Sequence, residues 1–352
     1  MTALLGAAIF AAAYALARAL LPRVERAARR AGYVDAPGGR KDHQTPTAYG
    51  GGLVVLAAVA APALLGVLAA ALDATQTAWP REIATYLPGV RAQAPRLLAI
   101  LLGAALHLAI GYVDDRRGLS ARLRFALEAA AALVLAVAGV RATAFLPWEA
   151  AQVLLTVVFV VFTVNATNFI DNMNGALAGV AAVQASCLLA LAVGSGQWFL
   201  AALLLALLGG LFAFLPWNVP TARMFLGDAG SLLLGFLFAA IVVAFDFERG
   251  DVSPKPFVIP ALLLAVPLAD GVVAVAGRLR RGVHPFTAGH DHLAHRLVRR
   301  GLSKPAAAAT LWGASCAAGL LALALSGTPP EAAVICVGPT ALFLWRRVRS
   351  AL

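Results

Sequence analysis

Charged residues are scarce in this chain of 352 residues. Asp, Glu, Lys and Arg make up 13% of the sequence, whereas a typical soluble domain has about 25%. Hydrophobic residues reach 61%, and a water-soluble chain of this length could not bury that much apolar surface. The composition therefore excludes an ordinary soluble globular protein and points to a lipid bilayer as the solvent.

Cysteine is also rare, and its placement excludes a disulfide framework. The three cysteines, Cys187, Cys316 and Cys336, lie inside apolar runs without metal-ligand spacing or a pairing pattern. We interpret them as small buried hydrophobic residues. The net charge of +11 does not indicate nucleic-acid binding, because no known reading module is visible and the basic residues lie in short loops between apolar runs.

Long apolar runs are what the sequence has instead. A transmembrane helix needs about 20 apolar residues. Runs of this kind occupy residues 2–22, 49–72, 96–113, 122–140, 150–167, 176–194, 197–216, 229–245, 256–276, 305–326 and 331–347. The pattern predicts an all-α, polytopic helical bundle of about 11 spans, or 10 if the tight pair at 176–216 is miscounted. We expect residues 1–352 to form one domain, and we expect residues 2–21 to be a retained span because they lack a basic n-region.

The positions of lysine and arginine predict the orientation of the bundle. With the N-terminus outside and the C-terminus in the cytoplasm, most basic residues fall on cytoplasmic segments, as the positive-inside rule requires. The outer loops then hold Arg81, Arg91, Arg96, Arg141, Arg249 and Lys255. The cytoplasmic loops, which are also rich in Asp, Asn, Gly and His, lie near 22–48, 114–121, 168–175, 217–228 and 277–304. We therefore expect the chemistry at the cytoplasmic face.

Two adjacent carboxylates, Asp114 and Asp115, lie at the predicted inner end of one span. Such a pair at a membrane boundary is unfavourable unless a cation or a phosphate-binding cluster compensates it. The alternative is a solvated helix cap. Because further acidic sites fall on the same face, we favour a functional pair.

Four amides and a carboxylate lie close together between two predicted spans, in the segment Asn165-Ala-Thr-Asn168-Phe-Ile-Asp171-Asn-Met-Asn174-Gly. Carboxylate and amide oxygens suit Mg²⁺, and amides also read nucleobase edges. The alternative is a polar turn that uses Asn and Gly for their backbone angles.

The segment Arg-Met-Phe225-Leu-Gly-Asp228-Ala-Gly-Ser precedes another span. Free backbone N–H groups at a helix N-terminus bind phosphate, and Asp228 could hold a cation beside them. An ordinary N-cap at Asp228 is the alternative, and the two roles are compatible.

Four of the six histidines fall in one late loop, with several arginines. His292 and His295 share a helix face, and with Arg281 and His290 they make a cationic, donor-rich surface for a diphosphate. The rivals are a His-x-His-x-x-His zinc site, which no nearby thiol supports, and a basic loop that only fixes topology.

Two further signals are weaker alone. Arg40 and Lys41, in a glycine-rich segment, could contact phosphate. Asp270, an ionisable residue inside a predicted span, is a functional hint, although a structural ion pair with Arg278 or Arg280 explains it equally well.

Taken together, these segments resemble the polyprenyl-phosphate N-acetylhexosamine-1-phosphate transferase family (glycosyltransferase 4 type), whose bacterial members include WecA-like and MraY-like enzymes. The likeness runs in order over residues about 33–300, and the last loop is closer to the WecA-like members. Three positions depart from the family pattern: Asn174 stands for a common Asp, Gly289 for a frequent Asp and Ala294 for a frequent His.

The resemblance implies transfer of a HexNAc-1-phosphate, by default GlcNAc-1-phosphate, from a UDP-sugar to undecaprenyl or another polyprenyl phosphate, with release of UMP. It implies Mg²⁺, with Mn²⁺ as the alternative, held by Asp228 and Asn168. Asp114 would meet the lipid phosphate with Asp115 supporting the metal region, while His292 and His295 clamp phosphates. Phe225 would stack the uracil, which Asp171 and Asn174 help to read.

Four other interpretations are compatible with the sequence. They are an MraY-like phospho-MurNAc-pentapeptide transferase, a secondary transporter, a lipid-pyrophosphate phosphatase and an inactive homologue. We expect a multi-pass protein of the bacterial inner membrane, with UDP-sugar and polyprenyl phosphate as partners, no nucleic acid, and a homodimer as an open alternative.

Overall fold

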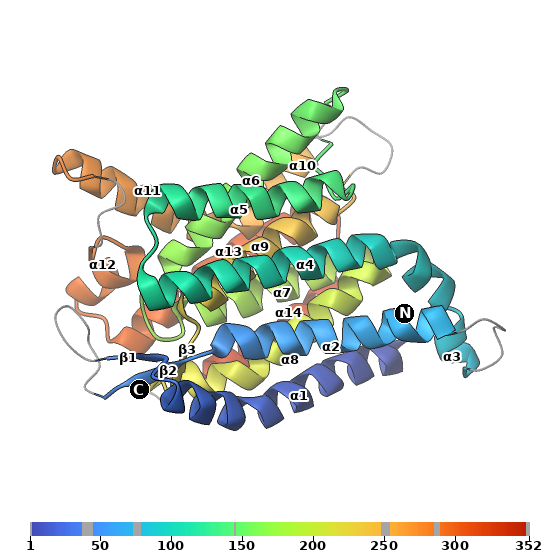
Figure 1. Cartoon of the computed structure of the whole chain (residues 1–352), viewed down its shortest axis with the longest axis horizontal. Helices are drawn as coiled ribbons and strands as arrows, with labels where there is room; N and C mark the ends of the chain where they lie inside the picture. The colour runs from blue at the N-terminus through green and yellow to red at the C-terminus, as the bar shows by residue number, and fades with distance from the viewer. Residues whose placement is uncertain are drawn as a thin grey trace.

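A computed structural model describes residues 2–36, 45–72, 79–143, 146–247, 254–284 and 289–349 of the chain (Figure 1). Helices dominate it. They are α1 (Ala3–Arg30), α2 (Gly51–Leu72), α3 (Arg81–Ala84), α4 (Leu87–Arg117), α5 (Ala121–Val137), α6 (Glu149–Ile170), α7 (Ala176–Gly194), α8 (Trp198–Asn218), α9 (Gly227–Ala244), α10 (Lys255–Leu263), α11 (Ala265–Arg280), α12 (Leu293–Arg299), α13 (Lys304–Ser326) and α14 (Pro330–Arg349).

The helices agree with a polytopic membrane protein. Within the described ranges, eight are long and apolar enough to cross a membrane, and α10 with α11 make a ninth if this pair, bent by 73°, is one span. Each predicted span falls on a helix. The remaining two spans correspond to α5, which has 17 residues, and α14, which carries Glu331 and three arginines. The chain is a multi-pass helical membrane protein, while the count of eleven and the orientation of its ends stay predictions.

The interior of the bundle is built around α7 and α9. In α7, 94% of the most apolar stretch of 18 residues is buried. Helix α9 packs against α2, α4 and α6. Glycines allow the closest approaches: a Cβ on Gly111 of α4 would lie 2.3 Å from the backbone of Asp228, and one on Gly52 of α2 would lie 2.5 Å from Gly230. Small residues at such crossings let helix backbones meet inside a membrane. They fix the start of α9 against the end of α4.

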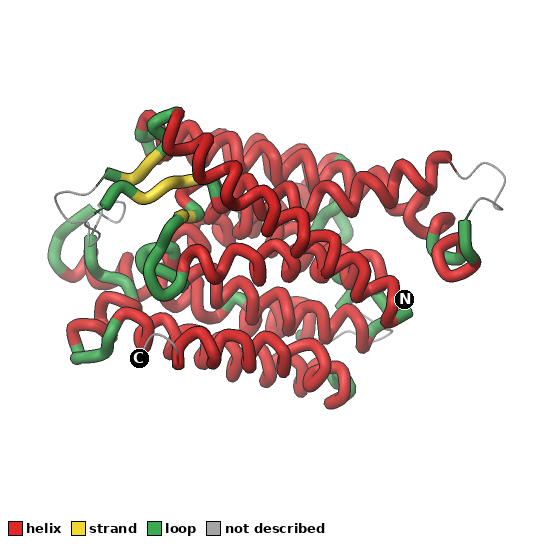
Figure 2. Tube along the Cα trace, turned by 90° about the horizontal axis from the view of Figure 1, so that it is seen from below, coloured by secondary structure: helices red, strands yellow, loops and turns green. Residues whose placement is uncertain are grey.

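A small sheet closes one end of the bundle, where the strands are yellow in Figure 2. It consists of β1 (Val34–Asp35), β2 (Thr47–Tyr49) and β3 (Met224–Phe225). β1 pairs antiparallel with β2, and β2 pairs parallel with β3, with Tyr49 opposite Phe225. The sequence predicts helices alone, because strands of two or three residues are too short to show an alternating pattern.

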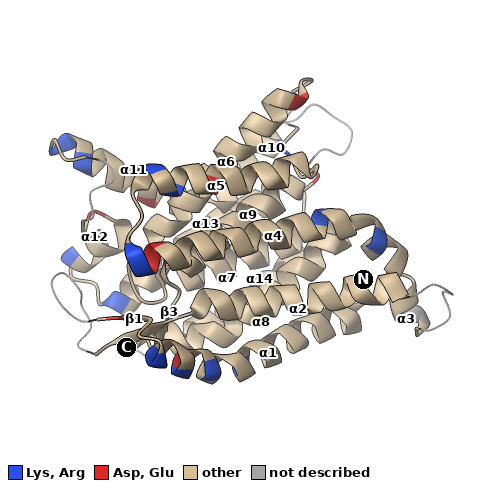
Figure 3. Ribbon diagram, viewed as in Figure 1, with Lys and Arg blue, Asp and Glu red and all other residues tan. Residues whose placement is uncertain are grey.

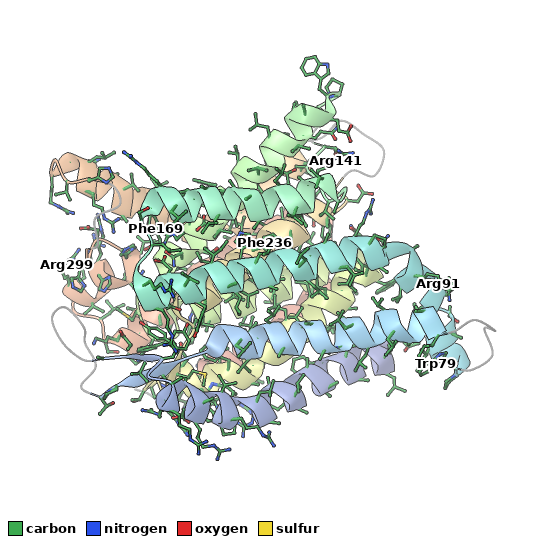
Figure 4. The ribbon with its side chains drawn as sticks, in the orientation of Figure 1. Trp79, Arg91, Arg141, Phe169, Phe236 and Arg299 are labelled. Atoms are coloured by element: carbon green, nitrogen blue, oxygen red, sulfur yellow. The ribbon has the colours of Figure 1, made fainter. Side chains whose placement is uncertain are left out.

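Many of the charged residues lie at the end of the bundle that holds the sheet, the C-terminal ends of α1 and α4, and α12 (Figure 3). In Figure 4, Phe169 and Arg299 lie toward this end, whereas Trp79 and Arg91 lie at the other. The structure thus brings the polar loops to one end, as the sequence predicts. Which compartment this end faces stays a prediction.

An apolar cavity of about 260 Å³ lies beside the break between α10 and α11. Phe159 and Phe162 of α6 line it, together with Phe245 and Phe257. It contacts the last turn of α9, so it lies away from the charged end of that helix.

Candidate active site

Four carboxylates meet where three helices end, and we name Asp114, Asp115, Asp171 and Asp228 the carboxylate cluster. The first two belong to the last turn of α4, the third follows α6 directly, and the fourth lies in the first turn of α9. The backbone N–H of Asp228 donates to Asp115 Oδ1 at 2.8 Å. The structure therefore joins acidic residues that lie far apart in the sequence.

Asp115 caps α9 across the helix crossing. Its carboxylate accepts the backbone N–H groups of Asp228 and Ala229, the latter at 3.1 Å, and the hydroxyl of Tyr33 at 2.6 Å. Burial and then the charge of Asp115 raise the pKa of Tyr33 above its ordinary value, so the phenol stays a donor. Gly227 adopts φ +68°, and a Cβ there would lie 2.7 Å from Asp115. Asp115, rather than Asp228, thus satisfies the exposed amides at this helix start.

Asn168 of α6 holds Asp228 from the other side. Its Nδ2 donates to Asp228 Oδ1 at 2.6 Å and to Ser231 Oγ at 2.9 Å. An amide can present either its nitrogen or its oxygen after a half turn, so the same side chain can offer an oxygen to a cation. The predicted pair of Asp228 and Asn168 is therefore in direct contact.

Asp171 is the least compensated member of the cluster. It is half-buried, and no described residue donates a hydrogen bond to its carboxylate. Burial, followed by the negative charges of Asp228 and Asp115, raises the pKa of Asp171 to about 8. A nearby cation would reverse this effect, because an opposite charge favours the ionised carboxylate.

Asp114 belongs to a polar network that the sequence analysis missed. Arg124 of α5 donates to Asp114 Oδ2 and to Asn165 Oδ1, both at 3.0 Å. Glu128, one turn further along α5, accepts from Asn165 Nδ2 at 2.5 Å and lies 3.4 Å from Arg124 Nε. Asn165, predicted to bind substrate, is thus engaged inside the protein. The signal that could have found Glu128 is that it is the single acidic residue in the run 122–140.

The turn after Asp171 is fixed by the protein interior. Gly175 donates from its N–H to Asn218 Oδ1 at 2.7 Å, and its carbonyl accepts from Trp312 Nε1 at 2.9 Å. Asn174 reaches the carbonyl of Pro220 at 3.5 Å, a weak contact. The two bonds to Gly175 fix the backbone next to Asn174, three residues after Asp171 of the carboxylate cluster.

The predicted stacking residue lies on the sheet. Phe225 is half-buried, and its ring centroid lies 6.2 Å from that of Tyr49 on the neighbouring strand. Burial and then the charge of Asp35 raise the pKa of Tyr49 above its ordinary value.

A second polar group surrounds the late histidines. His292 Nδ1 lies 2.7 Å from Asp270 Oδ2, and the N–H of Leu293 donates to Asp270 Oδ1 at 2.6 Å. The other ring nitrogen of His292 lies 3.2 Å from Arg278 Nη2, and the guanidinium of Arg278 lies 5.7 Å from the Phe169 ring centre. Asp270 therefore binds the histidine and the start of α12.

Asp291 links two arginines in the same region. It accepts from Arg278 Nε at 3.2 Å and from Arg281 Nη2 at 2.6 Å. Burial alone would raise the pKa of Asp291, but these two hydrogen bonds outweigh it and hold the pKa below its usual range. We name Asp270, Arg278, Arg281, Asp291 and His292 the arginine–histidine cluster.

His290 and His295 lie beside this cluster, with ring centres 4.6 Å apart. Among the described residues, no group of three or more His, Cys, Asp or Glu side chains is arranged to hold one metal ion. This finding gives the zinc alternative no support. Arg40 and Lys41, predicted to contact phosphate, lie outside the described residues.

The carboxylate cluster fits Mg²⁺. In sites that bind phosphates, Mg²⁺ takes one or two protein carboxylates and completes its shell with water and substrate oxygens. Asp228 with the turned amide of Asn168 offers such a set, and the uncompensated Asp171 stands beside it. A complete cage of protein ligands is not required.

Fold and site define a class: a multi-pass helical membrane protein with an acidic site at one end of its bundle. The family model for glycosyl transferase family 4 matches residues 97–246. A decaprenyl-phosphate N-acetylglucosaminephosphotransferase of Mycobacterium tuberculosis (strain ATCC 25618 / H37Rv) is 31% identical over 310 residues, which cover 80% of this chain and 72% of the relative. This chain belongs to glycosyl transferase family 4.

Two other relatives agree. A probable undecaprenyl-phosphate N-acetylglucosaminyl 1-phosphate transferase of Bacillus subtilis (strain 168) is 29% identical over 294 residues, covering 81% of this chain and 75% of the relative. An undecaprenyl-phosphate alpha-N-acetylglucosaminyl 1-phosphate transferase of Escherichia coli (strain K12) is 28% identical over 291 residues, covering 79% and 72%. The predicted family resemblance to WecA-like transferases is confirmed.

Proposed function

We propose that this protein transfers GlcNAc-1-phosphate from UDP-GlcNAc to a polyprenyl phosphate and releases UMP, at the cytoplasmic face of a bacterial membrane. The names of the relatives support the lipid acceptor and the sugar. The observation that carries the proposal is the carboxylate cluster, in which α4, α6 and α9 bring four acidic residues together at a helix N-terminus.

The central problem of this reaction is the repulsion between two anions. In phosphoryl transfer, catalysis consists mainly of positioning and charge stabilisation. Asp228 and Asn168 would hold Mg²⁺, which when bound neutralises the diphosphate and the departing UMP. Asp171, which lacks a compensating partner among the described residues, would face the same cation. Asp115 keeps the start of α9 in place beside them.

Asp114 would orient the acceptor. A phosphate monoester has a second pKa of about 6, so the lipid phosphate is mostly a dianion at neutral pH and needs no strong base. Asp114 would position it or take a residual proton. An oxygen of the lipid phosphate bonds to the β-phosphorus, and the bond from that phosphorus to the oxygen of UMP breaks.

A two-step route through a covalent aspartyl intermediate on Asp114 is the alternative. Both oxygens of this carboxylate are already engaged, by the N–H of Leu119 at 2.7 Å and by Arg124. This engagement supports direct displacement. Trapping a stable phosphosugar adduct on Asp114 would overturn it.

At the other side of the site, Phe225 and Asn174 would receive the uracil. Phe225 offers an aromatic face on the sheet, and the turn that carries Asn174 is held by Asn218 and Trp312. Aromatic faces stack on bases with little sequence preference, while amides provide the hydrogen bonds that choose among them.

The test is a transfer assay with the purified protein in detergent. It contains undecaprenyl phosphate, Mg²⁺ and a panel of UDP-sugars, and it measures both UMP and the lipid-diphosphate-sugar. We expect a Mg²⁺-dependent product with UDP-GlcNAc. Asp228→Asn should abolish it, while Asp246→Asn, beyond the far end of α9, should leave it unchanged.

Other outcomes would replace the proposal. A product with UDP-MurNAc-pentapeptide alone indicates the MraY-like alternative. Release of inorganic phosphate from lipid pyrophosphate indicates a phosphatase, and uptake into vesicles without chemical conversion indicates a transporter. No product from folded protein with any UDP-sugar would overturn the proposed donor class.

A further inference from the structure

Asp270 has no part in the chemistry described so far, although its position is unusual. It lies in α11, within the bent pair of helices, and its side chain is fully buried. A carboxylate inside a membrane bundle is costly unless donors surround it. It accepts from the ring of His292 and from the backbone of Leu293, the first residue of α12.

These contacts decide which ring nitrogen of His292 carries the proton. The nitrogen that faces Arg278 must accept, because a guanidinium only donates. The nitrogen that faces Asp270 must then carry hydrogen, because a carboxylate accepts. His292 is thereby fixed as the Nδ1–H tautomer, with the lone pair of Nε2 directed at Arg278.

The arrangement continues toward the carboxylate cluster. The Arg278 guanidinium lies over Phe169, which is the neighbour of Asn168 on α6. The ring of His292 also lies against Phe169, with centres 5.8 Å apart. Arg278 is also held by Asp291, which accepts a hydrogen bond from its Nε. The orientation of this buried guanidinium thus depends on its contacts with both His292 and Asp291.

We propose that Asp270 is a positioning residue for the transfer reaction: it holds His292 as the Nδ1–H tautomer, and so fixes Arg278 beside the donor diphosphate. The reaction part rests on the proposed function, whereas the tautomer stands on contacts alone. Fixed charges stabilise a reacting anion better than mobile ones, because they need no reorganisation. A residue that orients such a group typically changes activity about 10–100-fold.

The first test is spectroscopic and independent of activity. The protein is labelled with ¹⁵N-histidine, and the signal of His292 is assigned by its loss in His292→Gln. We expect a protonated Nδ1 and an unprotonated Nε2. A signal from the opposite tautomer, or from a doubly protonated ring, would overturn the proposal whatever the variants do.

The second test measures turnover per folded molecule. Asp270→Asn keeps the shape of the side chain. Its amide nitrogen cannot accept, so it loses the hydrogen bond either from the His292 ring or from the Leu293 backbone N–H. We expect kcat to fall at least about 10-fold and the His292 signal to shift, with the KM for polyprenyl phosphate unchanged. Thr340→Val removes a buried bond to Ser186 between α7 and α14, and should leave both unchanged.

A double variant separates positioning from general damage. If Asp270 acts through His292, the variant Asp270→Asn/His292→Gln is no slower than His292→Gln alone. Effects that multiply, or wild-type kcat in folded Asp270→Asn, would overturn the proposal. If the wild-type protein converts no UDP-sugar, the proposed function and the reaction role fail together, while the ¹⁵N spectrum still decides the tautomer.

Discussion

The two polar clusters at the charged end of the bundle differ in how their charges are balanced. In the carboxylate cluster, like charges lie together, and burial with the neighbouring carboxylates raises the pKa of Asp171 to about 8. In the arginine–histidine cluster, acids and donors alternate, and Asp291 has a lowered pKa because Arg281 and Arg278 bind it. In the first cluster, Asp171 has no hydrogen-bond donor among the described residues, whereas in the second cluster both carboxylates are paired with donors.

The largest effect should follow from a change in the carboxylate cluster, which we propose to hold Mg²⁺. Asp228→Asn keeps the shape and removes one negative charge beside Asn168. Loss of a group that stabilises developing charge typically slows a reaction about 10²–10³-fold, so kcat should fall at least that far. Mg²⁺ titrations of the transfer assay check this. Activity within 3-fold of the wild type, as an order-of-magnitude limit, would contradict it.

A smaller effect on kcat is expected at Glu128, which contacts the carboxylate cluster indirectly, through Arg124. Glu128→Met removes both acceptors that hold Arg124 and Asn165, so the orientation of Asp114 is loosened. We expect kcat to fall about 10–100-fold. Glu128→Gln should lose less, because its amide oxygen can still accept the hydrogen bond from Asn165 while the ion pair with Arg124 is lost. If the Gln and Met variants are equally slow, the charge rather than the position of Glu128 matters.

The pKa of Asp171 predicts a stability effect of unusual sign. Since the folded protein raises this pKa from an ordinary value near 4 to about 8, the folded state binds more protons between these limits, and stability falls as pH rises through them. Without Mg²⁺, Asp171→Asn should therefore raise the unfolding temperature at pH 8 and change it little at pH 4. Thermal unfolding in detergent with a chelator measures this. A lowered unfolding temperature at pH 8 would show that the charge is compensated.

The smallest effect should come from the exposed edge of the second cluster. The side chain of Arg281 is 52% exposed, whereas that of Arg278 is 4% exposed, although both bind Asp291. Exposed ion pairs contribute about 0–1 kcal/mol, so Arg281→Ala should leave the unfolding temperature nearly unchanged. Arg278→Ala should lower it clearly, because Asp291 and His292 both lose their partner. Equal decreases in unfolding temperature would show that the exposed Arg281 and the buried Arg278 contribute equally to stability.

The sequence predicts the helices and the acidic motifs well, for a physical reason. Apolar runs long enough to span a bilayer are unambiguous, and acidic residues beside them are rare enough to be noticed. The meeting of Asp115, Asn168 and Asp228 was not derivable, because it depends on how closely α4, α6 and α9 pack. The partners of His292 could not be predicted either. Asp270 lies 22 positions earlier in the chain, and no repeating sequence pattern indicates a hydrogen bond between two such residues.

The glycines at the helix crossings limit how the protein can move. No methyl group fits at Gly111 against Asp228 or at Gly52 against Gly230, so α2, α4 and α9 shift together or not at all. A change in the distance between α4 and α9 would therefore also separate Asp115 from the backbone of Asp228. The bent pair α10 and α11 packs mainly against α13 and α6, away from these two glycine crossings. The closely packed ends of α2, α4 and α9 thus hold the acidic residues at fixed distances from one another.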